Sequence, residues 1–488
     1  MLKLDNNSLI RDQAYIDGEW RGARSGARFP VRNPATGEVI AEVADLAEDD
    51  VREAIEAADR AFQPWRGKTA KERAVVLRKW YELMMAGQED LAQLMTAEQG
   101  KPLAESRGEI AYGASFIEWF AEEGKRIYGD VIPTNAQGRR IIVLKEAIGV
   151  VAAVTPWNFP NAMITRKVGP ALAAGCTVVV KPAQLTPLSA LALAELAHRA
   201  GLPKGVFNVV TSTQSARVGK ELTTNPLVKK FSFTGSTEVG KQLMVQCAST
   251  VKKVSLELGG NAPFLVFDDA DLDRAIEGAL VSKYRNTGQT CVCANRFLVQ
   301  DGIYDAFAAK LAKAVAALKV GDGALPGVEQ GPLINMAAVE KVEALIADGV
   351  SHGAKIAIGG KRHTLGGTFF EPTIVRDATP EMAFAREEIF GPVATLFRFA
   401  KDEDAIRMAN DTIYGLAAYF YARDVGRIFR VMEGLEYGIV GVNEGIISTE
   451  VAPFGGMKQS GIGREGSKYG IEDFVQIKYV AMGGLSAP

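Results

Sequence analysis

Helical spacing of apolar residues dominates the first quarter of the chain. Apolar positions recur every three or four residues over 51–62, behind the acids Asp49 and Asp50, which favour the start of a helix. Helical periodicity continues over about 71–127, and YIDGEW (15–20) predicts a short strand with a turn. The N-terminal part of the chain is therefore expected to be mainly helical.

The middle third alternates short β-branched runs with a helical run. Parallel strands buried on both faces have this character, and helices cross between them. The alternation predicts a doubly wound parallel sheet, and a second α/β region follows from about residue 260. The predicted strands are TVVV (177–180), VFNVV (206–210) and KFSFTG (230–235), the helix is 186–200, and the second region opens with an acidic helix start at 267–280 and contains a glycine-rich stretch at 352–367.

Two further apolar runs lie outside that alternation. RRIIVLKEAIGVVAAV (139–154) is rich in β-branched residues and is interrupted near Lys145 and Glu146. It therefore predicts paired extended segments that form an arm or a hairpin. Near the C-terminus, VQIKYVAM (475–482) predicts another strand, consistent with such an arm. An extended arm exposes strand edges, which a partner subunit would cover.

Length and composition indicate a multidomain protein of balanced charge. A chain of 488 residues exceeds the size of a single core, so two or three domains are expected. The 56 basic and 58 acidic residues leave a net charge of -2, which offers nucleic acid no electrostatic foothold. The chain has no run of about 18 apolar residues, and MLKLDNNSLIRDQ has no continuous apolar core, so neither a membrane span nor a targeting peptide is expected.

Cysteine and histidine usage narrows the chemistry. Cys176, Cys247, Cys291 and Cys293 are too few to staple this chain and match no zinc pattern, so we expect a reducing compartment, the cytoplasm, and no metal. GQTCVC places Cys291 among small and polar residues, where a thiolate can be exposed as a nucleophile; an inert core cysteine is the alternative. The three histidines leave a Cys–His hydrolase unsupported.

Two other short motifs carry polar side chains suited to acyl chemistry. LELGG (256–260) places Glu257 beside a strand end, where an acid can activate water as a general base. TPWNFP (155–160) holds Asn158 between prolines, where its amide can donate to an oxyanion. Taken singly, a solvated or salt-bridged glutamate and an ordinary turn are the alternatives.

FTGSTEVG (233–240) predicts a phosphate-binding turn. A strand passes through Gly235 and Ser236 into a helix, whose N-terminal N–H groups can face a pyrophosphate. An ordinary tight turn is the alternative. The literal G-x-G-x-x-G at 461–466 lies too near the C-terminus for a βαβ unit, so we assign it no cofactor.

Seven motifs, in order, resemble the aldehyde dehydrogenase superfamily over nearly the whole chain: VTPWNFP, TVVVKPA, FTGSTEVG, LELGGNAPF, GQTCVCANR, EEIFGP and PFGGMKQSG. The resemblance implies an α/β fold with a Rossmann-like cofactor domain (1–130 and 149–258) and a catalytic α/β domain (259–440). A segment 441–469 is implied to return past the active site, and 131–148 with 470–488 to form a small β oligomerisation arm. It also implies a homotetramer or homodimer.

The same resemblance implies the catalytic roles. Cys291 resembles the nucleophile, Glu257 the general base, and Asn158 with the backbone N–H of Cys291 the oxyanion hole. Thiolate attack on an aldehyde then gives a thiohemiacetal, and activated water hydrolyses the thioester that follows. A CoA-acylating enzyme and a non-catalytic protein on the same scaffold are the rival interpretations. Glu257 argues against the first, and the intact catalytic set argues against the second.

The resemblance implies NADP or NAD as the cofactor. The residues implied to bind it are Thr155; Trp157 and Lys181, on the adenosine ribose side; Gly235 and Ser236, at the pyrophosphate; and Glu388 and Phe390, at the nicotinamide ribose and ring. NAD-preferring members commonly have a glutamate three residues after the lysine, where this chain has Gln184. A neutral Gln184 removes the repulsion of a 2′-phosphate, so NADP is the expected preference.

Four stretches resemble succinate-semialdehyde dehydrogenases within the superfamily. They are NAMITRK (161–167), SKYRNTGQTCVCANR (282–296), NEGIIST (443–449) and GREGSKYGIEDF (463–474). This implies oxidation of succinate semialdehyde to succinate in γ-aminobutyrate degradation, with glutarate semialdehyde or a broader aldehyde range as the alternative. Arg166, Arg285 and Ser448 are implied to bind the substrate carboxylate. Without the resemblance, structural ion pairs would explain either arginine better.

Cys293 resembles a position that in some relatives forms a reversible disulfide with the catalytic cysteine. Such a bond to Cys291 would switch activity off under oxidation. A link between residues two apart would require the loop to bend. Packing of Cys293 as a small apolar residue is the simpler alternative.

Overall fold

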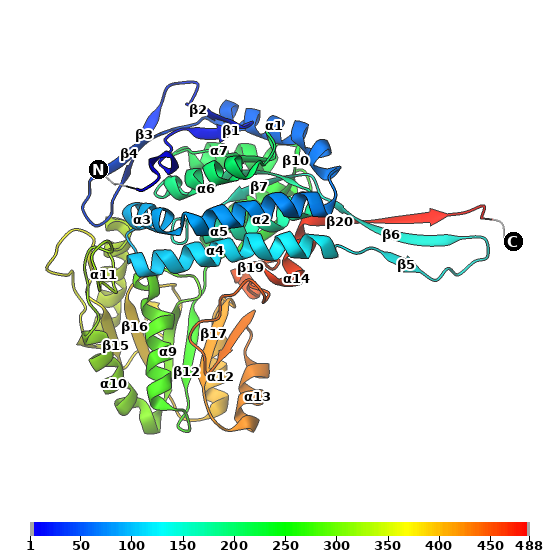
Figure 1. The fold of residues 1–488 in the computed structure, drawn as a ribbon. Helices are drawn as coiled ribbons and strands as arrows, with labels where there is room; N and C mark the ends of the chain where they lie inside the picture. Colours follow the sequence, from blue (N-terminus) through cyan, green and yellow to red (C-terminus); the bar gives the residue numbers. More distant parts are fainter. Residues whose placement is uncertain (1–3, 486–488) are drawn as a thin grey trace.

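Two open sheets and a protruding antiparallel arm make up the chain in the computed structural model, which describes residues 4–485 (Figure 1). The predicted ranges 1–130 and 470–488 therefore lie partly outside the described residues, at 1–3 and 486–488. Both large sheets carry helices on both faces, which confirms the predicted α/β class. No helix within 4–485 is long and apolar enough to cross a membrane.

The first sheet is a doubly wound parallel sheet with antiparallel edges. Its strand order is β19-β11-β10-β7-β8-β9-β1-β2, and the five strands from β11 to β9 run parallel. The strands predicted in the middle third are confirmed, as is the turn at 15–20, which joins β1 to β2. The strands are β1 (Ala14–Ile16), β2 (Glu19–Arg21), β7 (Val150–Val154), β8 (Thr177–Lys181), β9 (Phe207–Val209), β10 (Val228–Thr234), β11 (Lys253–Glu257) and β19 (Gly461–Ile462).

Helices cover both faces of this sheet because alternate strand residues are apolar on both sides. Val150 and Ala152 of β7 pack with α1, α7 and α8, whereas Val151 and Ala153 pack with the layer of α2 to α6. The predicted helical stretch 71–127 is confirmed as α2 to α4. The helices are α1 (Glu48–Arg66), α2 (Ala70–Ala86), α3 (Gln88–Gln99), α4 (Leu103–Glu123), α5 (Ala162–Ala174), α6 (Pro187–Ala200), α7 (Ser215–Thr224) and α8 (Thr237–Ala248).

The second sheet has the order β14-β15-β16-β13-β12-β17-β18 and is parallel except for β14. Helices α9 and α10 cover one face, and α11, α12 and α13 cover the other. The elements are β12 (Ala262–Val266), α9 (Leu272–Tyr284), β13 (Ala294–Gln300), α10 (Tyr304–Ala316), α11 (Met336–Ser351), β14 (Lys355–Ile358), β15 (Thr373–Arg376), β16 (Val393–Phe399), α12 (Asp402–Asn410), β17 (Ala417–Tyr421), α13 (Val425–Gly434) and β18 (Ile439–Val442). The second α/β region predicted from about 260 is thus confirmed.

Strands β5 (Asp130–Ile132), β6 (Arg140–Ala147) and β20 (Val475–Met482) form the antiparallel arm that projects from the body in Figure 1. The predicted break near Lys145 and Glu146 is wrong, because β6 runs through both residues and ends before Gly149. Gly149 has φ +134°, which lets the chain turn from the arm into β7. Strands β6 and β7 therefore belong to different sheets and do not form a hairpin.

Smaller elements complete the chain. A separate hairpin pairs β3 (Arg28–Arg32) with β4 (Val39–Ala44), and α14 (Ser467–Gly470) follows β19. Short 3-10 helices lie at Asn7–Leu9, Gly124–Arg126, Arg285–Gly288, Asp301–Ile303, Ala383–Ala385, Lys458–Ser460 and Ile471–Phe474.

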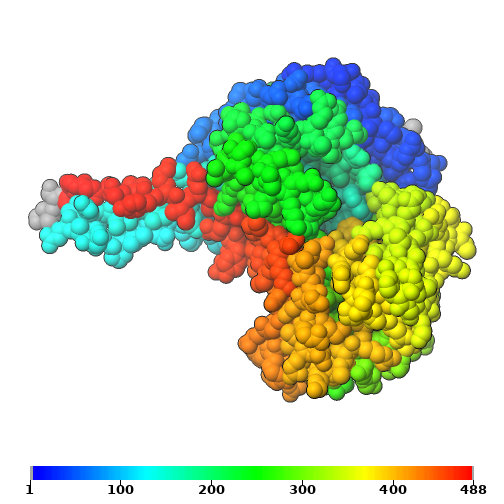
Figure 2. All heavy atoms as spheres, turned by 180° about the vertical axis from the view of Figure 1, so that it is seen from behind, coloured from blue at the N-terminus to red at the C-terminus, as the bar shows by residue number. Residues whose placement is uncertain are grey.

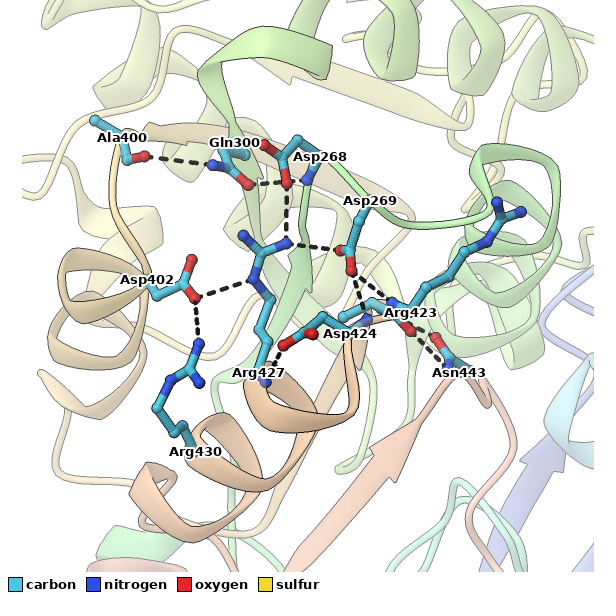
Figure 3. Close-up of polar contacts among 11 residues, drawn as sticks. Asp268, Asp269, Gln300, Ala400, Asp402, Arg423, Asp424, Arg427, Arg430 and Asn443 are labelled. Atoms are coloured by element: carbon cyan, nitrogen blue, oxygen red, sulfur yellow. Dashed lines mark hydrogen bonds and ion pairs between the residues drawn. The ribbon is translucent and has the colours of Figure 1, made fainter.

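An ion-pair cluster around Arg427 ties α13 to the loops at the far end of the second sheet (Figure 3). The Arg427 guanidinium donates to Asp269 at 2.7 Å, to Asp268 at 2.9 Å and to Asp402 at 3.0 Å. Asp269 also accepts from the backbone N–H groups of Arg423 and Asp424. One half-buried guanidinium therefore joins the loop after β12, the first turn of α12 and the start of α13.

Replacing Arg427 with alanine is expected to destabilise the second sheet. The side chain is only 17% exposed, and its loss leaves three carboxylates without their shared cation. We expect a loss of about 2 kcal/mol, between the values typical of exposed and buried pairs, and a melting temperature lower by several degrees. Arg407→Ala is the matched control, because Arg407 is 71% exposed and pairs only with Asp404. Equal shifts in the two variants, measured by scanning calorimetry, would contradict this role.

Candidate active site

A pocket of about 280 Å³ lies between the two large sheets. In Figure 2 it opens at the hollow between the green surface of α8 and the yellow-green surface of α11. Segments that follow β7, β10 and β11 line one side, and segments that precede β13 and β16 line the other. The lining residues are Pro156, Trp157, Asn158, Met163, Thr234, Gly235, Ser236, Leu258, Gly259, Cys291, Ala338, Lys341, Glu388 and Phe390.

The first sheet positions its side of the pocket through the carboxyl ends of its parallel strands. Residues 155–158 follow β7, Lys181 ends β8, Gly235 follows β10, and Glu257 ends β11. Loops at the carboxyl ends of neighbouring parallel strands converge at one edge of a sheet, where open α/β folds bind their ligands. Seven of the sequence-predicted site residues therefore line one pocket: Trp157, Asn158, Gly235, Ser236, Cys291, Glu388 and Phe390.

A strained loop presents Cys291 to the pocket. Asn286 and Thr287 adopt left-handed conformations with φ 52° and 56°, which cost energy for residues with a side chain. Gly288 follows with φ 75°, and a Cβ there would lie 2.2 Å from the carbonyl oxygen of Gly391. A Cβ on Gly260 would lie 2.6 Å from the carbonyl oxygen of Cys291. Only glycine permits these two close approaches, which place Cys291 between the two sheets.

Hydrogen bonds across the pocket hold Asn158. Its backbone carbonyl accepts from Lys101 Nζ at 2.7 Å and from Asn286 Nδ2 at 3.0 Å. Its own Nδ2 donates to the carbonyl of Gln289 at 3.0 Å, on the loop that carries Cys291. A side-chain amide has two N–H groups, so the second remains available to an oxyanion.

Sequence analysis missed the residues that anchor Asn158. Lys101 on the loop before α4 forms a fully buried ion pair with Glu109 at 2.6 Å. Glu109 in turn accepts from the backbone N–H groups of Asn161 and Ala162, at the start of α5. The signal available in the sequence was a lysine and a glutamate eight residues apart in a helical region, which is common on exposed helices.

The Cys291 thiol is protonated in the protein alone. Burial raises its pKa to about 12, against the lowering effect of the Arg166 charge. The carboxylates of Glu388 and Glu257 raise the pKa further. Among the four cysteines Cys291 is the one that is partly exposed. Its reactivity therefore depends on groups that arrive with the reactants and stabilise the thiolate.

Cys293 is a buried free thiol. It is 4% exposed, and its Sγ donates to the carbonyl of Lys283 at 3.1 Å. This arrangement suits a small packing residue. The proposed disulfide with Cys291 stays a prediction, and its formation would require this contact to break.

Glu257 ends β11 as a buried acid without a hydrogen-bond partner for its Oε2 within the described residues. Burial raises its pKa well above the ordinary value, and the charge of Glu465 adds to this effect. The positive charges of Arg166 and Lys167 act in the opposite direction. An unpartnered carboxyl with a raised pKa is suited to accept a proton from water.

Glu465 links the two basic residues at 166 and 167 of α5 to the return segment. It lies 2.7 Å from Arg166 Nε and 2.5 Å from Lys167 Nζ, and all three side chains are buried. Burial lowers the pKa of Arg166, but the combined effect of Glu465, Tyr112, Glu257 and Cys291 outweighs burial and raises the pKa above the ordinary value. Arg166 therefore has an acid partner, but it shares that one carboxylate with Lys167, so the three residues together keep one net positive charge.

Arg285 and Ser448 lie near the same end of the site. The Arg285 guanidinium lies 5.3 Å from the ring centroid of Phe159, next to Asn158. Within residues 4–485 it makes no ion pair, unlike Arg166. Ser448 is half-buried in the segment after β18. Arg285 is therefore the arginine whose charge is available to a ligand.

The opposite end of the pocket fits a dinucleotide. Ser236 caps α8 by accepting from Val239 N–H, so the helix N-terminus faces the pocket beside Gly235. Two threonine hydroxyls at strand ends, Thr155 Oγ1 and Thr234 Oγ1, are buried without a partner within the described residues. Orphaned buried hydroxyls at such a place are satisfied by a bound polar ligand.

Lys181 ends β8, and Gln184 lies on the loop that follows it. Burial lowers the pKa of Lys181 to about 8, and its Nζ has only a weak 3.4 Å contact to the carbonyl of Pro182. Gln184, three residues further along, is exposed. A buried lysine with so little compensation is suited to ribose or phosphate oxygens.

Glu388 and Phe390 close the pocket from the second sheet. Burial raises the pKa of Glu388 to about 7, although the backbone N–H of Gly260 donates to its Oε1 at 3.2 Å. The rings of Phe390 and Trp157 meet edge to face at 5.6 Å. The pair forms an apolar wall that suits the face of a flat heteroaromatic ring.

The fold and this pocket define an α/β oxidoreductase with a cysteine nucleophile, and comparison with known proteins identifies its family. Residues 20–480 match the Aldehyde dehydrogenase family, and the chain belongs to it.

The chain is 64% identical to a glutarate-semialdehyde dehydrogenase of Pseudomonas aeruginosa and to a succinate-semialdehyde dehydrogenase [NADP(+)] of Escherichia coli, in each case over 99% of this chain and 100% of the relative. The crystal structure of an E. coli NADP dependent enzyme superimposes with a TM-score of 0.98 at 64% identity, covering 99% of this chain and 100% of that one. The predicted family and its fold are thereby confirmed.

Alkylation of Cys291 in the cofactor-free protein is expected to accelerate with pH. A thiol with a raised pKa is mostly protonated at pH 7, so iodoacetamide labelling should rise about tenfold per unit between pH 7 and 9. Peptide mass spectrometry should find the label on Cys291, while buried Cys293 serves as the internal control. A rate that levels off near pH 8 would show that the thiolate already forms at neutral pH.

Proposed function

We propose that the chain oxidises succinate semialdehyde to succinate with NADP, through a thioester on Cys291. The observation that carries this proposal is the gathering of Cys291, Asn158 and Glu388 in one pocket, with unpartnered Glu257 at the adjoining strand end. Membership of the aldehyde dehydrogenase family supports the reaction class. The names of the two 64% identical relatives support a semialdehyde substrate.

The Cys291 thiolate attacks the aldehyde carbon, and the carbonyl electron pair moves to oxygen as the C–S bond forms. Asn158 Nδ2 and the backbone N–H of Cys291 donate to this oxyanion. When bound, the nicotinamide would accept the hydride that leaves this carbon, and the oxyanion electron pair re-forms the carbonyl to give the thioester. Glu257 then takes a proton from water as the water oxygen attacks the thioester carbon. The C–S bond breaks, the Cys291 thiolate leaves, and the carboxylic acid is released.

The unpaired charge of Arg285 supports a substrate with a carboxylate. Arg166 is largely committed to Glu465, whereas Arg285 is held beside Phe159 without an acid partner in the part of the chain that is described. We propose that Arg285 and Ser448 bind the carboxylate and that Arg166 adds to the local positive charge. A half-buried cation without a counterion favours an anionic ligand.

NADP is the proposed cofactor, with NAD also accepted. Gln184 offers no negative charge against a 2′-phosphate, and Lys181, at the end of β8, has no carboxylate in hydrogen-bond contact within residues 4–485. The E. coli relative named as NADP-dependent supports this choice. Trp157, Thr155, Gly235, Ser236, Glu388 and Phe390 would hold the rest of the dinucleotide.

The remaining proposals concern architecture and setting. We assign 1–130 and 149–258 to a cofactor domain, 259–440 to a catalytic domain, and 441–469 to a return segment. Antiparallel pairing of β19 with β11 beside Glu257 supports that last range. The exposed apolar residues of the arm, among them Val131 and Ile477, support its role in a homotetramer or homodimer. A cytoplasmic role in γ-aminobutyrate degradation would suit the proposed substrate.

Glutarate semialdehyde is the second candidate substrate. It differs from succinate semialdehyde by one methylene, which binding pockets discriminate by only about 1–3 kcal/mol. The name of the P. aeruginosa relative favours it as strongly as the E. coli name favours the shorter substrate. Transfer of the acyl group to coenzyme A is disfavoured, because Glu257 offers a base for hydrolysis.

The substrate proposal predicts a strong preference for aldehydes that carry a carboxylate. With NADP, kcat/KM for succinate semialdehyde should exceed that for butanal by at least about 100-fold, because butanal leaves Arg285 unpaired. NADP should support a higher kcat/KM than NAD. Arg285→Met should reduce the preference for the carboxylate, and Arg274→Met is the control on an exposed helical arginine. Equal kcat/KM for both aldehydes in the wild-type enzyme would overturn the proposal.

Glu257→Gln is expected to stop the reaction at the thioester. The variant should release about one NADPH per site in a burst and then turn over at least about 100-fold more slowly than wild type. Wild-type deacylation should accelerate as pH rises, because burial raises the pKa of Glu257 and the reactive carboxylate forms only above it. Stopped-flow absorbance measures both phases, and exposed Glu403→Gln is the control. An unchanged steady-state rate in Glu257→Gln would exclude Glu257 as the base.

A further inference from the structure

One polar atom near the substrate end of the site has no role in the mechanism above. The hydroxyl of Tyr112, on α4, is buried and makes no hydrogen bond of good geometry within the described residues, although the Ser448 hydroxyl is close enough to lower its pKa. A buried hydroxyl without a partner costs free energy, and native proteins seldom leave one unless a ligand completes it. The residues around the Tyr112 hydroxyl therefore indicate which ligand could bond to it.

Tyr112 is flanked by the aromatic neighbours of both arginines. Its ring meets Phe116 edge to face at 5.0 Å, and the Arg166 guanidinium lies 5.8 Å from that same Phe116 ring. On the other side Tyr112 packs on the small cluster of Phe159 and Met163. The Arg285 guanidinium lies 5.3 Å from Phe159.

The same cluster reaches the catalytic pocket. Met163 lines that pocket together with Cys291 and Asn158, and Phe159 directly follows Asn158 in the chain. Tyr112 therefore packs against a residue that lines the pocket and is close enough to both arginines for their charges to lower its pKa. A substrate whose aldehyde carbon is at Cys291 would extend its far end toward this region.

We propose that Tyr112 is a specificity-determining residue whose hydroxyl donates a hydrogen bond to the terminal carboxylate of the semialdehyde, beside Arg285. The inference rests on the proposed function and adds a neutral donor to the carboxylate site. Glu465 pairs with Arg166 and Lys167, whereas Arg285 has no acid partner in the described part of the chain. A second donor from a neutral hydroxyl satisfies another carboxylate lone pair without burying a further charge.

The protonation state of Tyr112 suits a donor. Burial raises the pKa of its hydroxyl above the ordinary value, and Glu465 adds to that rise, whereas Arg166, Arg285 and the Ser448 hydroxyl oppose it without cancelling it. The hydroxyl therefore keeps its proton over the whole range in which the enzyme would work. Phe116, Phe159 and Met163 hold the ring, so the donor is preorganised before the substrate arrives.

Tyr112→Phe removes the hydroxyl and keeps the ring. We expect the ratio of kcat/KM for succinate semialdehyde to that for butanal to fall about tenfold, mainly through a higher KM for the semialdehyde. The competitive inhibition constant of succinate should rise by a similar factor, while the dissociation constant of NADP stays within twofold. The control is Tyr128→Phe, because Tyr128 is 70% exposed at the root of the arm and has no contact with this cluster.

The outcomes separate this inference from the proposed function. If wild-type enzyme shows no preference for the semialdehyde over butanal, the proposed function fails before Tyr112 is tested. If wild type shows the preference and Tyr112→Phe keeps the ratio of the two kcat/KM values within twofold, Tyr112 does not bind the carboxylate. Equal losses of kcat/KM with both aldehydes would assign Tyr112 a structural role and overturn the inference. A tenfold fall of the ratio with an unchanged melting temperature supports it.

Discussion

The site depends on the backbone carbonyl of Asn158, whose hydrogen bonds connect the segments from the two sheets that carry the proposed catalytic residues. That oxygen accepts from Lys101 and from Asn286, so it connects the loop before α4, the loop after β7 and the strained loop before β13. The Asn158 side chain returns a hydrogen bond to Gln289 on the same strained loop. The oxyanion donor and the nucleophile are thus held relative to each other by bonds that cross between sheets. The cost of the left-handed residues Asn286 and Thr287 is offset by these contacts.

Burial is the largest influence on the pKa values of the titratable groups near Asn158. Removing Cys291 and Glu257 from water raises the pKa of both, so neither is in its reactive charge state by default. The positive charge of Arg166 lowers the pKa of Glu257 and so opposes the effect of burial. Glu465 pairs with Arg166 and itself raises the pKa of Glu257, so the pKa stays high. A Cys291 thiolate and a Glu257 carboxylate would repel each other. Raised pKa values favour the protonated form of both groups and so reduce this repulsion before reactants bind.

The sequence predicted the regular part of the fold well and the cross-sheet contacts poorly. Strands such as 177–180 and 230–235 have a strong local signal, because parallel strands buried on both faces are continuous β-branched runs. The break near Lys145 was misplaced because an exposed arm strand can include a polar pair such as Lys145 and Glu146 without ending. Lys101 and Tyr112 fall within 71–127, where the helical periodicity indicates only packing. Lys101 contacts Asn158 and Tyr112 packs on Phe159, both more than 40 residues away, and no local pattern contains such partners.

The two arginines at the substrate end of the site differ in their ion pairs: Arg166 has an acid partner, and Arg285 has none within the described residues. If Arg166 and Arg285 both lacked an acid partner, their mutual repulsion and desolvation would destabilise the empty site. Glu465 provides a shared partner for Arg166 and Lys167, and Arg285 is left as the arginine that a substrate carboxylate would pair with. A carboxylate has more lone pairs than one guanidinium can satisfy, so the remaining donors must be neutral. Ser448 and Tyr112 are hydroxyls in this region, and neutral donors add hydrogen bonds to a bound carboxylate without adding a further positive charge to the empty site.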